Sequence, residues 1–161
     1  MPIQFLSSVL FVQDVEASRN FYEKLLGQEV EMDFGPNVGF KGGFAIWQID
    51  HASQMIFERP ANGTDQLGRK NFELYFEAVD LDAVLGRLTD AGVSMVHPIR
   101  EHPWGQCVFR VYDPDGHIVE VGEPMPVVIQ RFLAQGMTPE AVAERTSMPL
   151  EIVRQVAEVA G

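Results

Sequence analysis

The chain has 161 residues, 46% of them hydrophobic and 22% charged, which is typical of a globular domain or two small fused modules. Its net charge of −11 argues against non-specific binding to nucleic acid or anionic membranes, because both need basic surfaces. No apolar run approaches the roughly 20 residues that cross a bilayer. The single Cys107 and an N-terminus without a basic leader favour a cytoplasmic protein.

The first half of the chain predicts one helix among several strands. A strand is expected at residues 5–12, and Asp14 then caps a helix over 15–26 that ends at Gly27. The polar stretch 60–70 lacks periodicity and is interpreted as a linker. Between helix and linker, three further strands are predicted, at residues 29–34, 44–50 and 54–59.

The pattern then starts again about 65 residues later. Asp80 follows a predicted strand at 71–79 and caps a helix that ends before Gly92. The turn Asp113–Gly116 joins the last two strands into a hairpin, and the strands are expected at residues 94–98, 106–112 and 117–123. An internal duplication explains this repetition. The predicted domains are a first module at 1–59, the linker at 60–70, a second module at 71–124 and a helical extension at 125–161.

Alternation within the strands predicts which side chains face a ligand. Glu73, Tyr75 and Glu77 share one face of their strand, opposite apolar residues that must pack under a helix. Gln106, Val108, Arg110 and Tyr112 share a face in the final hairpin. We therefore expect a sheet with helices on one side and an acidic, aromatic-lined cavity on the other.

Three further side chains are singled out near this expected cavity. Glu120 lies between Val119 and Val121, where a carboxylate needs a cation, a polar cavity or water. Trp104 either stacks on a planar ligand or anchors its loop to the core. Arg110 either binds an anionic group or pairs with one of the cavity glutamates.

Paired βαβββ modules, the junction VDLDA at 79–83 and the hairpin DPDGHIVE at 113–120 resemble the vicinal oxygen chelate superfamily. This group includes glyoxalase I, extradiol dioxygenases and bleomycin-binding proteins. The resemblance covers about residues 4–124. It implies an α+β fold of two tandem βαβββ modules (the glyoxalase/bleomycin-resistance fold) that form an open, cavity-lining sheet, and it implies a homodimer.

The resemblance also implies positions for a divalent metal. The ligand of the last strand falls on Glu120, and that of the second module's first strand on Glu73. The first-module positions fall on Ser7 and at or beside Glu58. Carboxylates without imidazole would favour an Mg- or Mn-like ion, if any metal is bound.

Two functions follow from these patterns. The first is a small-molecule binding or resistance protein that lacks the usual His/Glu metal site and uses Glu73, Tyr75, Glu77, Trp104 and Arg110. The alternative is a glyoxalase-like lyase or extradiol-type dioxygenase, with Glu120 as the catalytic residue and a carboxylate-rich metal site.

Residues 125–161 lie outside the resemblance and predict three helices, the second capped by Thr138 with Pro139 at its first position. Their spacing is similar to a helix-turn-helix unit. The expected recognition helix carries Glu151 and Glu158, which is unfavourable for phosphate contact, so we expect no DNA binding. The extension is expected to cover a sheet edge, build a dimer contact or close a cavity mouth.

Overall fold

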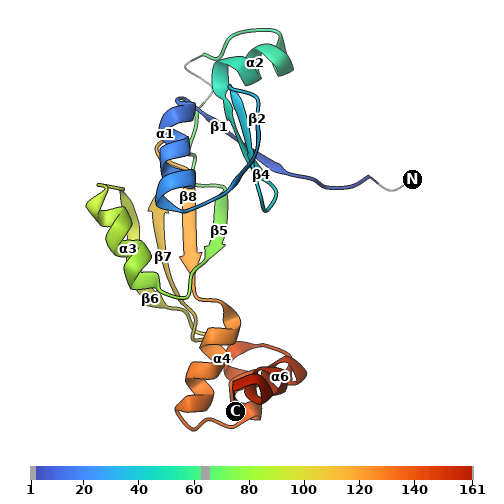
Figure 1. Cartoon of the computed structure of the whole chain (residues 1–161), viewed down its shortest axis with the longest axis vertical. Helices are drawn as coiled ribbons and strands as arrows, with labels where there is room; N and C mark the ends of the chain where they lie inside the picture. The colour runs from blue at the N-terminus through green and yellow to red at the C-terminus, as the bar shows by residue number, and fades with distance from the viewer. Residues whose placement is uncertain (1–2, 63–65, 161) are drawn as a thin grey trace. The chain divides into compact units, whose positions relative to one another are not determined.

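A computed structural model describes residues 3–62 and 66–160 (Figure 1). The helices and strands follow one another along the chain in the order β1 (Ser8–Val12), α1 (Val15–Arg19), the π-helix η1 (Asn20–Leu25), β2 (Val30–Asp33), β3 (Asn37–Phe40), β4 (Phe44–Gln48), α2 (Ile49–Phe57), β5 (Glu73–Glu77), α3 (Leu81–Asp90), β6 (Met95–Glu101), β7 (Cys107–Tyr112), β8 (Ile118–Gly122), α4 (Met125–Ala134), α5 (Pro139–Thr146) and α6 (Leu150–Ala160). The predicted linker at 60–70 includes residues 63–65, which lie outside the described residues.

The chain divides into two compact units, here called unit 1 (residues 1–72 and 112–117) and unit 2 (residues 73–111 and 118–161). Each contains one four-stranded sheet, with strand order β1-β4-β3-β2 in unit 1 and β5-β8-β7-β6 in unit 2. In each sheet the first strand pairs in parallel with the last. This topology confirms the predicted α+β fold of duplicated βαβββ modules with helices at the C-terminus.

Matching N-caps relate the two units residue by residue. The Asp14 carboxylate accepts hydrogen bonds from backbone N–H groups of α1, and the Asp80 carboxylate does so for α3. Counting back seven residues from each cap pairs Ser7 with Glu73. The same alignment equates the strand pair Val9–Ala45 with Tyr75–Glu120, so Ala45 occupies the place of Glu120 in unit 1.

Two predictions for the first module are wrong. Residues 54–59 do not form a strand: they belong to the end of α2 and the turn after it, because Ile49, Ala52 and Ser53 are buried at helical spacing. The last strand of the module is instead β4. The sequence analysis also missed β3, whose buried Val38 and Phe40 alternate normally but are surrounded by glycines that indicated a turn.

The turn of the final hairpin is fixed by a buried hydrogen bond in unit 1. The Tyr22 hydroxyl donates to the Asp113 carboxylate at 2.7 Å, and the other oxygen of Asp113 accepts from the backbone N–H groups of Asp115 and His117. Burial, together with the neighbouring Asp113 charge, raises the pKa of Tyr22 well above its ordinary value. The turn therefore has its hydrogen-bonding groups satisfied inside the fold.

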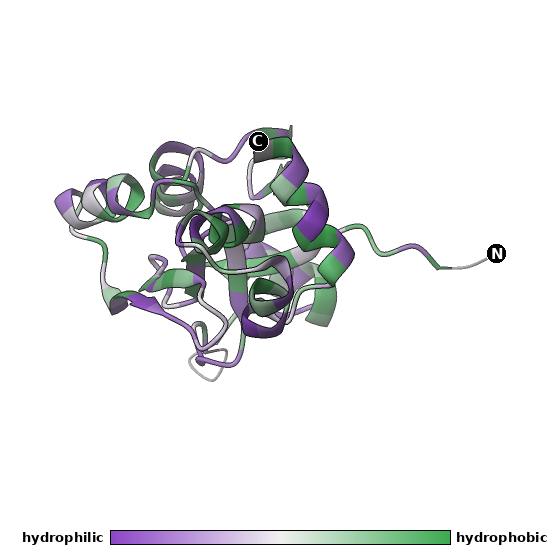
Figure 2. Cartoon of the chain, turned by 90° about the horizontal axis from the view of Figure 1, so that it is seen from below, coloured by the Kyte–Doolittle hydropathy of each residue, from purple (hydrophilic) through white to green (hydrophobic). Residues whose placement is uncertain are grey.

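The three C-terminal helices form a small core of their own in unit 2. Val128, Ile129, Phe132, Val142 and Val153 are its buried members. Each helix carries hydrophobic and hydrophilic residues together, as expected for an amphipathic helix packed on one side (Figure 2). One exposed ion pair, Arg154 with Glu140, joins α6 to α5.

Candidate functional site

The functional site predicted from the sequence falls on one face of the unit 2 sheet. Tyr75 in β5 lies directly opposite Glu120 in the adjacent parallel strand β8, so their side chains share a face. Glu73 and Glu77 flank Tyr75 with the same alternation, and all three are more exposed than Leu74 and Phe76 between them. We call Glu73, Tyr75, Glu77, Gln106, Arg110 and Glu120 the polar face.

One group of contacts on the polar face is centred on Arg110. Its Nε donates to Glu73 Oε2 at 2.8 Å, and its Nη2 forms an ion pair with Glu120. Its Nη1 donates to His97 Nε2 at 3.1 Å, while His97 Nδ1 donates to the Pro98 carbonyl at 2.8 Å. Both contacts fit a single tautomer of His97. One guanidinium thus joins two carboxylates and an imidazole from three other strands.

A second group of contacts on the polar face is centred on Tyr75. Its hydroxyl donates to Glu77 at 3.0 Å and accepts from the Gln106 side-chain amide at 2.9 Å. Trp104 Nε1 donates to the side-chain oxygen Oε1 of Gln106 at 3.0 Å, which links the tryptophan to Tyr75. Partial burial and the Glu77 carboxylate raise the pKa of Tyr75, so the phenol stays protonated near neutral pH.

The aromatic side chains on and beside the polar face are partly exposed but held by contacts with their neighbours. Tyr75 is 47% and Trp104 39% exposed. His102 stacks on Trp104 with ring centroids 4.3 Å apart, and burial followed by nearby Arg110 lowers the pKa of His102. The sequence analysis left the two roles of Trp104 open, and the exposed ring with a bonded indole nitrogen is compatible with both.

The helical extension holds the loop that carries Trp104. Arg131 of α4 donates to the Gly105 carbonyl at 2.6 Å and to both oxygens of Glu123, at 3.0 and 3.1 Å. Glu123 in turn accepts from the Cys107 backbone N–H. Partial burial is the main factor that raises the pKa of the Cys107 thiol. These contacts position Gln106 and Trp104 against the end of β5.

The donor set does not fit a metal ion of the expected kind. Glu73 and Glu120 lie on the polar face as the resemblance implies, but Arg110 already bonds both. The corresponding unit 1 positions are Ser7 and Ala45, and Ala45 has no ligand atom. Glu58 ends α2 with an exposed side chain and a left-handed backbone, so its expected place on a last strand is wrong. Among residues 3–62 and 66–160, no three His, Cys, Asp or Glu side chains gather closely enough to hold a metal.

Sequence reasoning missed His97, Glu123 and Arg131 as neighbours of the site. Arg131 lies outside the repeated modules, and no local pattern links it to Glu123. Gln106 was assigned to the correct face but not to the site, although its alternation with Val108 and Arg110 was already visible. His97 lies beside an irregularity in the pairing of β6 with β7, which the sequence does not reveal.

Comparison with known proteins agrees with this architecture. The glyoxalase-like domain family matches residues 5–126. The chain is 28% identical over 128 residues to an uncharacterized protein of Mycobacterium tuberculosis, covering 74% of each chain. A solved protein of unknown function from Agrobacterium tumefaciens is 39% identical, with a TM-score of 0.70 over 77% of this chain and 96% of that one. The lactoylglutathione lyase of A. tumefaciens shares the fold at 23% identity, with a TM-score of 0.58 over 78% and 96% of the respective chains.

The chain therefore belongs to the glyoxalase-like domain family, within the vicinal oxygen chelate superfamily. The family match ends at residue 126, so nearly all of the helical extension lies outside it. None of the helices in the described parts of the chain is both long and apolar enough to span a bilayer.

Proposed function

We propose that the polar face of unit 2 binds a planar organic cation without a metal ion. The observation that carries this proposal is the position of Arg110, whose guanidinium bonds both Glu73 and Glu120. One arginine against two carboxylates leaves an excess of negative charge. Glu77, whose only described hydrogen bond comes from Tyr75, adds to it. This charge supports a cationic ligand.

The exposed rings support a planar ligand. Tyr75 and Trp104 are joined through Gln106, so both rings can contact one flat molecule near Glu77. A cation over an aromatic face gains electrostatic energy, and the gain grows as water is excluded. In this proposal Glu77 pairs with the ligand charge, Tyr75 and Trp104 contact its rings, and Arg110 keeps Glu73 and Glu120 in place.

Isothermal titration calorimetry of the protein with N-methylacridinium tests the proposal. Glu77→Gln is expected to weaken binding about tenfold, because a charge-assisted contact to the ligand is lost. Glu58→Gln removes the same charge from an exposed position in unit 1 and is expected to leave the affinity unchanged. Neutral acridine, at a pH where it carries no proton, is expected to bind more weakly. Equal binding of acridine, or an effect of Glu58→Gln as large as that of Glu77→Gln, would contradict the proposal.

We also propose that the protein is a homodimer in the cytoplasm. Its first module ends at residue 59, its linker covers residues 60–70, and its second module covers residues 71–124. Self-association is supported by the apolar N-terminal side chains Ile3, Phe5 and Leu6, each at least 74% exposed.

A further inference from the structure

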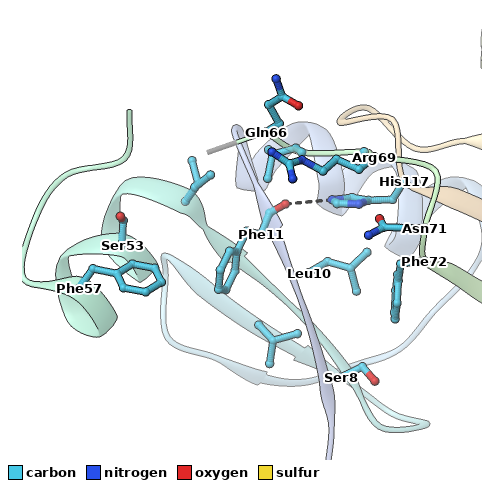
Figure 3. Close-up of a pocket in the computed structure, with 14 residues that line it drawn as sticks. Ser8, Leu10, Phe11, Ser53, Phe57, Gln66, Arg69, Asn71, Phe72 and His117 are labelled. Carbon is cyan, nitrogen blue, oxygen red and sulfur yellow. Dashed lines mark hydrogen bonds between the residues drawn. The ribbon is translucent and has the colours of Figure 1, made fainter. Parts of the chain in front are cut away.

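Unit 1 contains a cavity of about 650 Å³ that none of the predicted site residues lines. It lies along β1, the edge strand of its sheet, and is also lined by residues of α2, of the segment 66–72 and by His117. Figure 3 shows Arg69 and Asn71 on the side of His117, with Ser53 and Phe57 of α2 on the other side. The volume suits one small organic molecule.

The lining combines large apolar side chains with several polar ones. Its large apolar side chains are Val9, Leu10, Phe11, Ile49, Phe57, Leu67 and Phe72. Arg69 is a cation in this lining, and no Asp or Glu is among the lining residues that the structure describes.

Several polar groups of the lining have no partner among the described residues. The side chains of Gln66, Arg69 and Asn71 form no hydrogen bond or ion pair with any residue that the structure describes. The Ser53 hydroxyl, in a side chain only 4% exposed, is likewise unpaired among the described residues. Buried polar groups are normally hydrogen-bonded, so an unpaired hydroxyl in a cavity wall indicates a missing partner.

One polar residue of the lining is held in place. His117 Nε2 donates to the backbone carbonyl of Phe11 at 3.0 Å, on the free edge of β1. The Asp115 carboxylate similarly accepts from the Gln13 backbone N–H at 3.1 Å. The hairpin turn is thus attached to the edge strand, which gives the cavity a fixed wall beside Arg69 and Asn71.

We propose that this cavity binds a small organic anion with an aromatic or aliphatic body, such as an apolar carboxylic acid. The carboxylate pairs with Arg69 and accepts hydrogen bonds from the Asn71 and Gln66 amides. The apolar body lies against Leu10, Phe11 and Phe57. This site is separate from the polar face of unit 2 and has the opposite charge preference, so it goes beyond the function proposed above.

Calorimetric titration with phenylbutyrate tests the assignment, with phenylbutylamine as the ligand of opposite charge. Phenylbutyrate is expected to bind saturably and the amine not to bind at this site. Arg69→Gln is expected to weaken phenylbutyrate binding about tenfold. Lys70→Gln removes the same charge from the next residue, which does not line the cavity, and is expected to leave the affinity unchanged.

Two outcomes would overturn the assignment: no saturable binding of phenylbutyrate, or equal effects of Arg69→Gln and Lys70→Gln. Amide shifts in an NMR titration locate the ligand, and they are expected in β1, α2 and residues 66–72. Shifts confined to other parts of the chain would also overturn it. Glu77→Gln is expected to leave phenylbutyrate binding intact, which separates this result from the test of the polar face.

Discussion

Replacing Arg110 with Met is expected to lower the free energy of unfolding by about 2 to 3 kcal/mol, because it leaves Glu73 and Glu120 without their shared cation. The Glu120 side chain is only 9% exposed, so water compensates poorly for the lost pair. Urea unfolding followed by tryptophan fluorescence measures the change. Arg110→Lys is expected to recover only part of the loss, since an ammonium group cannot reproduce the geometry of a guanidinium that contacts three partners.

The matched control is Arg154→Met, which breaks an ion pair whose partners are both about 60% exposed. That pair is expected to contribute less than about 1 kcal/mol. Adding Glu120→Gln to Arg110→Met removes the uncompensated charge and is expected to restore part of the lost stability. If Arg110→Met cost no more than Arg154→Met, the central role of Arg110 would be wrong.

Gly105→Ala is expected to destabilise unit 2 by about 2 to 4 kcal/mol and to loosen the helical extension. Gly105 has a φ of +87°, and a Cβ there would lie 2.3 Å from the ring of Phe132 in α4. A Cβ at this position therefore requires the Phe132 ring or α4 to move. Since Arg131 binds the Gly105 carbonyl, the same movement would disturb Trp104 and Gln106. Thermal unfolding and Trp104 fluorescence measure the two effects.

Gly136→Ala separates backbone strain from the steric clash. Gly136 has a similar φ of +89°, but a Cβ there would meet nothing within 4 Å. Its substitution is expected to cost only about 1 kcal/mol, from the left-handed backbone alone. Equal losses at Gly105 and Gly136 would show that the contact with Phe132 does not attach the extension to the loop.

Much of the fold follows from local signals in the sequence. The Asp14 and Asp80 caps, the turn at Asp113–Gly116 and the alternation around Tyr75 each reflect interactions between near neighbours, so a short stretch suffices to predict them. Alternation placed Glu73, Tyr75 and Glu77 on one face of their strand and Arg110 on a face of the final hairpin, while the place of Glu120 came from the resemblance to the superfamily. Pairing of Arg110 with a cavity glutamate was one of its two predicted roles, and the structure shows such pairs with Glu73 and Glu120. The other contacts were not predicted, because strand register is set by the whole sheet.

The errors lie where local signals conflict or where the partner is distant. Residues 54–59 contain apolar side chains at the end of a short helix, and such runs do not distinguish helix from strand. Because of this ambiguity, Glu58 was predicted to lie on a strand, and Ala45 was not recognised as the counterpart of Glu120. The contact of Arg131 with Glu123 and Gly105 joins the extension to the second module, and no repeat or motif encodes it.

Metal analysis of protein purified without a metal-affinity tag tests most directly the claim that Arg110, rather than a metal ion, holds the two carboxylates. Elemental analysis would be combined with thermal-shift titrations with Mn, Mg, Ni, Zn and Fe(II), on the native protein and on Glu120→Gln. We predict no stoichiometric metal and no stabilising shift that depends on Glu120. A stoichiometric metal, or a stabilisation that is lost in Glu120→Gln, would contradict the claim and favour the metal-dependent enzyme.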